Sequence, residues 1–535
     1  MTTYLRSNAW NKGGTFANTD LLWYAKAVGA MQARPLRDPS SWWFFAAMHA
    51  QYVKEKAYPG WGSLPGVPRV AVTPEPPHDV SNRYWDQCQH QSWYFLPWHR
   101  GYLLAVEAHM RAAIVSSGGP ATWALPYWNY FGAGSEWNIP PAFTRRALPD
   151  RSQNPLYVTA RYGPDNDGHI FIPTPPIFQQ HRTDPHLVSG PVTDACLAND
   201  LFTGTDPNTP PPGFGGPETG FWSGGRPFVS GSLEQNPHNL IHVYVGGTEP
   251  GTDDHGGLMS DPGTAALDPI FYLHHANIDR MWAVWNGSAH ANPTAANWLS
   301  GPTANGERQF VMPMPDGKKW VFKPQDVVPL GTLDYTYDDL PPLAPAGSQL
   351  ARRLARLGAT AAISEKDAAM VAPRKTQELV GANPEPLPLT GTGASATVRL
   401  APDIRRKMTT SLAEAAVTKA PDRVFVHLEN VRGTRDATVL SVYINVPEGE
   451  LPSDHPDLLA GSVGLFGLRR ASAVDGAHGG QGLTFLLEIT NIIDALHLRD
   501  ALNEDSLKVT IVPHQRLPER PLVTIGRISI YREGA

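Results

Sequence analysis

The pattern of apolar positions divides the chain into a first part typical of helices and a last part typical of strands. Long apolar and aromatic runs predict helices over residues 38–56, 232–246 and 268–285. Within residues 88–111 we predict a loop that contains His90, followed by a helix that has Pro97 in its first turn and runs through Glu107. Asp38, Ser40 and Ser41 offer caps for the first of these helices. From about residue 396 the pattern alternates, and stretches such as RVFVHLENV and ATVLSVYINV predict strands. We therefore expect a mainly α domain followed by an all-β domain.

The segments between the predicted helices are rich in turn-forming residues. The chain has 49 Gly and 52 Pro, which indicates long ordered loops around a helical core. The composition of residues 346–395 differs from that of the segments before and after them. An Ala- and Arg-rich run is followed by EPLPLTGTGASAT. We predict a domain over 1–345, a partly helical linker over 346–395, and a β-sandwich over 396–535.

Composition excludes several classes of function. The net charge of the 535 residues is −6, which does not favour nucleic acid as a partner. No apolar run is long enough to span a membrane, and MTTYLRSNAWNKGG has no secretory h-region. Cys88 and Cys196 are the only cysteines, so no disulfide framework is expected and a cytoplasmic location is predicted.

Histidines are the candidate chemistry of the first part. Six of them lie on or beside the predicted apolar helices, namely His49, His90, His99, His238, His242 and His275. A single histidine in such a place is more often a core residue than a ligand. His238 and His242 have i, i+4 spacing, however, which aims two imidazoles from one helix face.

The stretch DPIFYLHHANIDRMW, residues 268–282, places His274 and His275 side by side in apolar surroundings. Asp279 follows His275 by one helical turn, and we expect its carboxylate to hold the second nitrogen of that imidazole. We also expect Asp279 to pair with Arg280. Together the six histidines form an early and a late group of three. Ligands that are all imidazoles favour Cu, Zn, Ni or Fe, and two similar sites indicate a pair of metal ions.

Two long motifs resemble the copper signatures of tyrosinases and polyphenol oxidases, the type-3 dicopper family. They are HQSWYFLPWHRGYLLAVE, from residue 90, and DPIFYLHHANID, from residue 268. DYTYDD resembles the tyrosine motif that closes the catalytic domain of this family, and KVTIVPH and VTIGRISI resemble the C-terminal domain of plant members. The resemblance implies a four-helix-bundle core that holds two copper ions.

The family's ligand roles carry over residue by residue. His49, His90 and His99 match the first copper, with His78 as the alternative to His49. His238, His242 and His275 match the second copper. His274 and Asp279 are then expected to lie next to the ligands without binding the metal, and Phe271 is expected to pack against the copper site.

A cysteine placed as Cys88 is, two residues before a ligand histidine, is joined to it by a thioether in several members of the family. We therefore predict a bond between Cys88 and His90, the alternative being a free buried thiol.

The resemblance implies oxidation of o-diphenols by O2 to o-quinones, the precursors of melanin. Some members first hydroxylate monophenols, and in relatives with a Glu and an Asn placed like Glu234 and Asn239 the pair holds a water that acts as a base. We expect that role here, although Glu234 could instead cap its helix. Val243 is small and is expected to leave the entrance open.

Other assignments remain open from the sequence. The same six histidines suit an oxygen carrier of the haemocyanin kind, a catechol oxidase or an o-aminophenol oxidase. A zinc hydrolase is disfavoured because no HExxH is present. The C-terminal domain is expected to shield the copper entrance, the alternative being contacts between copies of the chain in a homo-oligomer.

Overall fold

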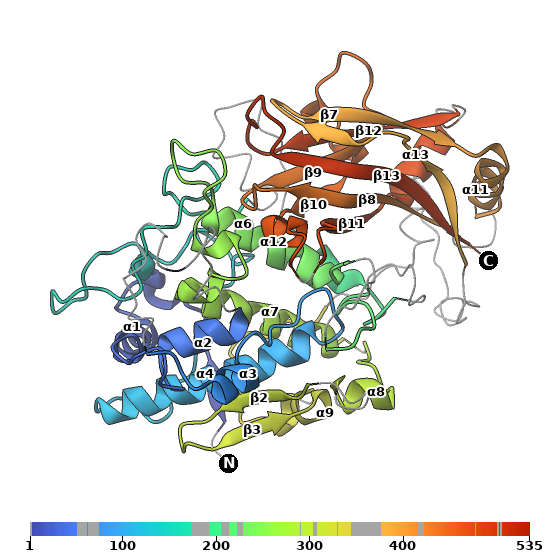
Figure 1. Cartoon of the computed structure of the whole chain (residues 1–535). Coiled ribbons are helices and arrows are strands. Elements are labelled where there is room, and N and C mark those ends of the chain that lie inside the picture. The colour runs from blue at the N-terminus through green and yellow to red at the C-terminus, as the bar shows by residue number, and fades with distance from the viewer. Residues whose placement is uncertain are drawn as a thin grey trace.

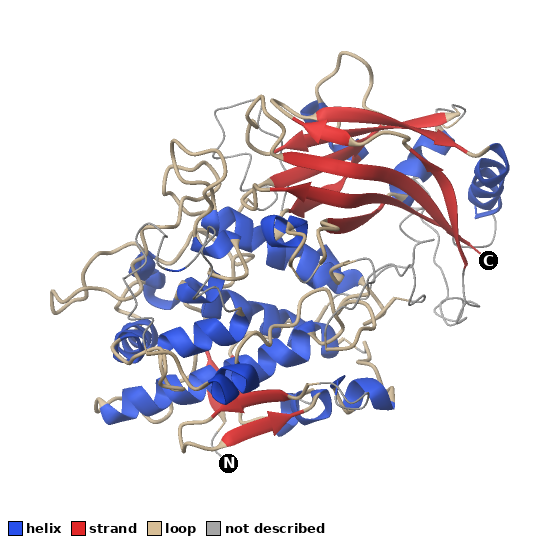
Figure 2. Cartoon of the chain, in the orientation of Figure 1, coloured by secondary structure: helices blue, strands red, loops and turns tan. Residues whose placement is uncertain are grey.

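The computed structural model has a helical N-terminal part and a β-rich C-terminal part that lies against it (Figures 1 and 2). It describes residues 3–50, 61, 74–173, 192–204, 213–221, 228–288, 290–302, 308–328, 330–343, 376–415, 422–476, 478–499, 502 and 505–534. Within these ranges, no helix has both the length and the apolar character needed to cross a membrane.

The N-terminal part contains helices connected by long loops. They are α1 (Thr19–Gln32), α2 (Trp42–His49), α3 (His78–Tyr84), α4 (Phe95–Ser116), α6 (Leu240–Gly246), α7 (Ile270–Asn286), α8 (Ala296–Leu299) and α9 (Pro324–Val327). Two small sheets accompany them: β1 (Tyr4–Arg6) runs parallel to β4 (Tyr335–Tyr337), and β2 (Phe310–Pro313) pairs with β3 (Lys319–Phe322). Helices α2, α4, α6 and α7 carry four of the six candidate histidines, which confirms the predicted helical core.

Local sequence explains where these helices begin. The Ser41 hydroxyl accepts the Phe44 N–H at 3.0 Å and caps α2, so Ser41 is the residue that fills the predicted capping role. Residues 51–56 of that predicted helix lie outside the described residues. Pro97 falls in the first turn of α4, as predicted.

The third predicted helix differs from expectation. Residues Glu234–Asn239 form a single wide turn, and α6 begins only at Leu240. The reason is local: Asn236 has the extended angles φ −149° and ψ 116°, which interrupt the helical path just before Pro237.

The C-terminal part is built around one nine-stranded sheet. Its strands are β5 (Thr376–Ala382), β6 (Leu387–Leu389), β7 (Ala394–Leu400), β8 (Arg423–Gly433), β9 (Val439–Ile444), β10 (Leu459–Gly464), β11 (Leu483–Glu488), β12 (Ser506–Pro513) and β13 (Val523–Gly534). The order is β10-β9-β12-β7-β5-β13-β8-β11, with β6 on β13. The end strands β10 and β11 contact each other, so the sheet is nearly closed. Helices α11 (Pro402–Ala415), α12 (Leu468–Ser472) and α13 (Thr490–Leu498) accompany it. The expected β-rich domain is confirmed.

The β-domain begins earlier than the predicted position 396. Residues 346–375 of the predicted linker lie outside the described residues, whereas 376–395 contain β5, β6 and the start of β7. Proline is typical of linkers and uncommon in strands, so Pro388 contributed to the prediction of a linker here. It lies in β6, which pairs only with β13, and an edge strand tolerates the missing N–H of proline.

The two parts share apolar packing. The hydrophobic core of the N-terminal part is rich in tryptophan and tyrosine, and it includes Val439 and Phe466 from the C-terminal part. Phe466 lies in the turn between β10 and α12. The C-terminal part therefore inserts an aromatic side chain among the helices.

Candidate metal centre

The first histidine group forms where α2 ends and α4 begins. His49 is the last residue of α2, His99 lies in the first turns of α4, and His90 lies in the loop before it. Potential ligand atoms of these three histidines and Cys88 all lie within 4.8 Å of one another. His78 is exposed in α3 and is hydrogen-bonded to Asn82, so the structure brings His49 into the group rather than His78.

The second group forms where α6 meets α7. It contains His238, His242, His274 and His275, whose ligand atoms also lie within 4.8 Å of one another. The His238 and His242 rings are 4.5 Å apart between centroids, as their i, i+4 spacing requires. The two groups adjoin each other, because the His275 ring stacks on His99 with 4.4 Å between centroids.

Carbonyl and amide oxygens fix how several of these imidazoles are oriented. The Nδ1 atoms of His49, His99 and His242 lie 2.8, 2.8 and 2.9 Å from the backbone oxygens of Pro262, Phe95 and Met259 respectively. Because a carbonyl only accepts, each Nδ1 carries the proton and each Nε2 keeps its lone pair. Such hydrogen bonds are the usual support of metal-ligating histidines.

The buried nitrogens fit a bound metal. Within the part of the chain that the structure describes, Nε2 of His49, His238 and His242 has no hydrogen-bond partner, and neither ring nitrogen of His274 or His275 has one. A buried polar atom without a partner is costly unless a ligand satisfies it. Burial also lowers the pKa of His49 to about 4 and that of His238 to about 3, so both rings are neutral at pH 7. Neutral, unpartnered imidazoles are the form that binds copper.

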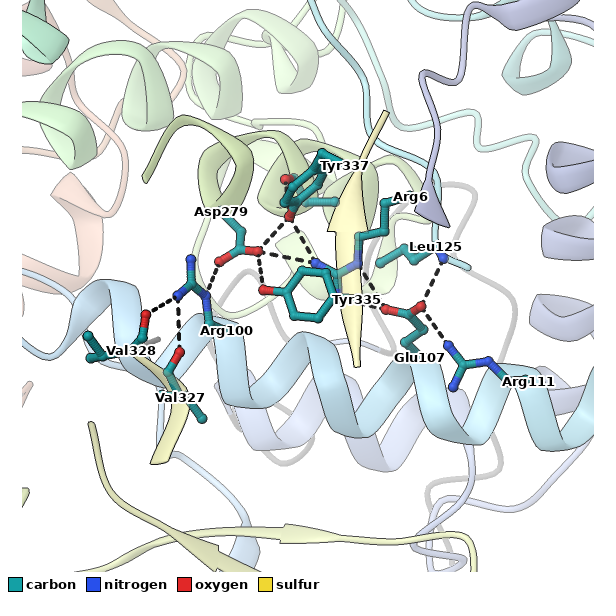
Figure 3. A network of polar contacts seen from close by, with 11 residues as sticks. Arg6, Arg100, Glu107, Arg111, Leu125, Asp279, Val327, Val328, Tyr335 and Tyr337 are labelled. Carbon is teal, nitrogen blue, oxygen red and sulfur yellow. Dashed lines mark hydrogen bonds and ion pairs between the residues drawn. The ribbon is translucent and has the colours of Figure 1, made fainter. Parts of the chain in front are cut away.

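Asp279 does not hold His275, so the expected contact is wrong. Its carboxylate instead accepts from Arg100 Nε at 2.5 Å and Arg6 Nη1 at 3.2 Å, and from the Tyr335 and Tyr337 hydroxyls at 2.6 and 2.5 Å (Figure 3). Burial alone would raise the pKa of Asp279, but Arg100 and Arg6 more than offset it, so that pKa lies below its ordinary value. These donors occupy the acceptor positions of the carboxylate.

The expected pair of Asp279 with Arg280 is also wrong. Arg280 Nη2 instead lies 2.5 Å from Asp339 Oδ2. Neighbouring residues of a helix point about 100° apart, so consecutive side chains meet different partners. Asp279 therefore anchors α7 to α4 and β1, and it positions the histidines through the helix.

We expect Asp279→Asn to lower the free energy of unfolding by about 3–5 kcal/mol, because it leaves the buried Arg100 guanidinium without its counter-charge. Urea denaturation of the metal-free protein measures this. The matched control is Asp200→Asn, whose carboxylate is 81% exposed, and it should change stability by less than about 0.5 kcal/mol. Equal effects of the two substitutions would contradict the anchoring role.

Cys88 lies against the ring of His90. Its Sγ is 3.5 Å from Nδ1 and 3.9 Å from Nε2 of that ring, the two atoms that flank Cε1. It is also 3.4 Å from Nε2 of His99. Burial raises the pKa of the Cys88 thiol well above its ordinary value, so the sulfur is not a thiolate here.

Glu234 and Asn239 are both buried beside the second group. Both Glu234 carboxylate oxygens accept the Gln91 N–H at 2.9 Å, which ties the wide turn to the loop that carries His90. Asn239 Oδ1 lies 2.8 Å from His238 Nδ1 and sets the orientation of that ring. Val243 is buried and lines a small cavity with Ala437 and other residues of the C-terminal part, rather than an open entrance.

Phenylalanines enclose the histidines. Phe271 lies 4.2 Å from His275 and 4.9 Å from His49 between ring centroids, in the position expected from the sequence. Phe466 stacks on His242 with 4.1 Å between centroids and an interplanar angle of 23°. Nothing in the sequence signalled Phe466, because it belongs to the other domain.

Comparison with known families covers both parts of the chain. The family described as the common central domain of tyrosinase matches residues 39–288, and a domain of unknown function matches residues 376–533. A tyrosinase of Hahella sp. (strain CCB-MM4) is 31% identical over 520 residues, which is 96% of this chain and 97% of that protein. A latent chloroplastic polyphenol oxidase of Prunus armeniaca is 31% identical over 287 residues, which is 52% of this chain and 40% of the relative.

Solved structures share the fold. Latent apple tyrosinase has a TM-score of 0.56 at 21% identity and covers 99% of this chain and 98% of its own. A recombinant latent aurone synthase has a TM-score of 0.57 at 20% identity, covering 100% of this chain and 90% of its own. Both similarities extend across the helical and the β-rich parts.

Proposed function

The chain belongs to the tyrosinase family, and on that premise we propose that it oxidises o-diphenols to o-quinones with O2 and also hydroxylates monophenols. The observation that carries the proposal is the pair of adjoining histidine groups with neutral rings and unpartnered nitrogens. Nitrogen-only ligation suits copper. Two copper ions bound there would supply the chemistry that activates O2 and accepts electrons from the phenol.

We propose His49, His90 and His99 as ligands of one copper ion, and His238, His242 and His275 as ligands of the other. The protein's contribution is to fix these rings and to exclude water. The carbonyls of Pro262, Phe95 and Met259 orient three of the rings. Phe271 packs against rings of both groups and keeps the space between them apolar.

Glu234 and Asn239 are proposed to hold a water that takes the proton from a monophenol. Burial raises the pKa of the Glu234 carboxyl to about 8, although hydrogen bonds from Gln91, Ser230 and Gly231 act in the opposite direction. The ionised form of this carboxyl can take a proton and return it, and the ionised fraction grows as the pH rises through about 8.

We expect Glu234→Gln to reduce turnover of L-tyrosine by about 100-fold while turnover of L-DOPA falls far less, because only the monophenol must lose a proton before hydroxylation. Steady-state rates on both substrates, with the copper content of each preparation, measure this. A parallel loss on both substrates at full copper content would instead assign Glu234 to holding the His90 loop.

A thioether between Cys88 Sγ and His90 is proposed from the position of the sulfur beside the ring edge. We expect the peptide that contains both residues to be lighter by two hydrogen atoms after copper and O2 are supplied, because a C–S bond replaces an S–H and a C–H bond. Peptide mass spectrometry measures this, with Cys88→Ser as the control. Quantitative alkylation of Cys88 in the copper-loaded protein would contradict the bond.

The C-terminal domain is proposed to act as a shield. Phe466 occupies the space next to His242 that an aromatic substrate would need. Docking is supported by charge: Arg435 Nη1 and Arg469 Nη2 donate to the backbone oxygens of Asp253 and Asp254 at 2.5 and 2.7 Å, and Arg520 Nη2 lies 2.9 Å from Asp253 Oδ2. Access to the copper site then requires this domain to move or to be removed.

A catechol assay before and after limited proteolysis tests the proposed activity. Turnover of L-DOPA and L-tyrosine supports a tyrosinase, and turnover of L-DOPA alone supports a catechol oxidase. Reversible O2 uptake by the copper-loaded protein without turnover, even after proteolysis, would favour oxygen binding and contradict the proposal.

A further inference from the structure

Ser230 lies between the two polar residues that flank the second histidine group. Its side chain is hydrogen-bonded to the Glu234 carboxyl, and its Oγ accepts from Asn239 Nδ2 at 3.5 Å. Ser230 is 5% exposed, Glu234 2% and Asn239 6%, so bulk water does not compete for these contacts.

The hydrogen bonds form a chain that runs in one direction. The His238 Nδ1–H donates to Asn239 Oδ1 at 2.8 Å, the Asn239 amide donates to Ser230, and the Ser230 hydroxyl donates to Glu234. Asn239 and Ser230 each accept one hydrogen bond and donate the next, and the carboxyl ends the chain. Hydrogen bonds aligned in this way polarise and strengthen one another.

The serine decides which way the asparagine faces. An amide group has donors at one end and an acceptor at the other. Because Ser230 Oγ receives the NH2 end of Asn239, the oxygen of Asn239 faces His238 and fixes the proton on Nδ1. The Nε2 atom of His238, which has no hydrogen-bond partner among the described residues, then keeps its lone pair for a metal ion.

The backbone on both sides of Ser230 is anchored. Val229 forms a β-bridge with Thr484 of strand β11, and the Phe228 ring stacks on His478 with 3.7 Å between centroids. On the other side, Gln235 N donates to Gly231 O at 2.8 Å. These contacts hold the Ser230 hydroxyl at a fixed place relative to α6.

We propose that Ser230 is a positioning residue of the second metal site, holding Asn239 so that His238 presents Nε2 to the metal. The inference rests on the proposed dicopper function and deepens it, since it adds a residue outside the ligand set to those that orient His238. Its effect is expected at one of the two metal sites only.

The test is the copper affinity of each site in the full-length protein, measured by competition with a chelator of known affinity. We expect Ser230→Ala to lower the copper affinity of one of the two sites by about 10- to 100-fold and to leave the affinity of the other site unchanged. This is the usual range for loss of a residue that supports a metal ligand. The matched control is Ser441→Ala, which removes a buried hydroxyl bonded at 3.0 Å to Ser462, far along the chain in the β-domain.

A second pair of variants distinguishes the effect of the Ser230 hydroxyl on copper affinity from the effect of side-chain shape. Threonine and valine have nearly the same shape, so Ser230→Thr should retain wild-type affinity at both sites and Ser230→Val should reproduce the defect of Ser230→Ala. Wild-type affinity at both sites in Ser230→Val, or equal weakening of both sites in all three variants, would overturn the inference. A wild-type protein that binds no copper pair would instead reject the proposed function, so the two failures are distinguishable.

Discussion

His275→Ala is expected to purify with one copper ion where the wild type holds two, and to lose oxidation of L-DOPA. Loss of a residue that merely supports a ligand costs about 10- to 100-fold in affinity or activity, so loss of the ligand itself should exceed that range. The His275 ring contacts both groups, with 4.4 Å to His99 and 4.9 Å to His238 between ring centroids. Metal analysis together with steady-state turnover measures both effects.

His274→Ala is the matched control for that substitution, because the two residues are adjacent and equally buried. The ring nitrogens of both lack partners among the described residues, and His274 lies 5.0 Å from His242 between ring centroids, so burial and distance alone do not separate them. The copper signature that the chain resembles assigns the ligand to the residue four before Asp279. His274→Ala should therefore keep two copper ions. If His274→Ala loses a copper ion and His275→Ala keeps both, His274 would be the ligand instead of His275.

Phe466→Ala is expected to increase L-DOPA turnover of the uncleaved chain. Burying a phenylalanine stabilises a contact by about 1.5–3 kcal/mol, and about 1.4 kcal/mol changes an equilibrium tenfold. We therefore expect about a 10- to 100-fold larger fraction of accessible sites. The ring is 6% exposed and lies against His242, so its removal also leaves space for a substrate ring.

Val474→Ala is the control for Phe466→Ala, because Val474 belongs to the same domain and is 84% exposed. It should leave turnover unchanged before and after proteolysis. If Phe466→Ala behaves like Val474→Ala and both still require proteolysis for activity, the bulk of the domain would block the site and the phenylalanine would have no specific role.

The helical core and the histidine groups could be predicted because their signals are local. The i, i+4 spacing of His238 and His242 fixes their common face whatever surrounds them, and the motifs around residues 90 and 268 carry their own helix patterns. The resemblance to the copper signatures then joined two distant segments that periodicity alone could not join.

The partners of Asp279 could not be predicted from local pattern. Arg6 lies 273 residues away in the sequence and Arg100 lies 179 away, and only the parallel pairing of β1 with β4 brings Arg6 beside Tyr335 and Tyr337. The helical spacing of Asp279 and His275 was read correctly, but spacing shows which residues share a face and not which groups a carboxylate will bind.

Contacts between the helical part and the β-rich part could not be predicted from the sequence either. Phe466 and Ser230 are ordinary residue types in turns, and their positions follow from how the β-domain lies on the helices. The start of the β-domain at Thr376 was missed for a related reason, since strands β5 and β6 are defined by pairing with β13 near the chain end. Tertiary pairing overrides the linker-like composition there.

The most direct test of the central claim is the copper content of the full-length protein, measured together with O2 consumption on L-DOPA after limited proteolysis. We expect two copper ions per chain and O2 consumption that stops when a chelator removes the metal. Two ions with no O2 consumption would contradict the enzymatic function, and a protein that binds fewer than two copper ions under saturating copper would contradict the paired site itself.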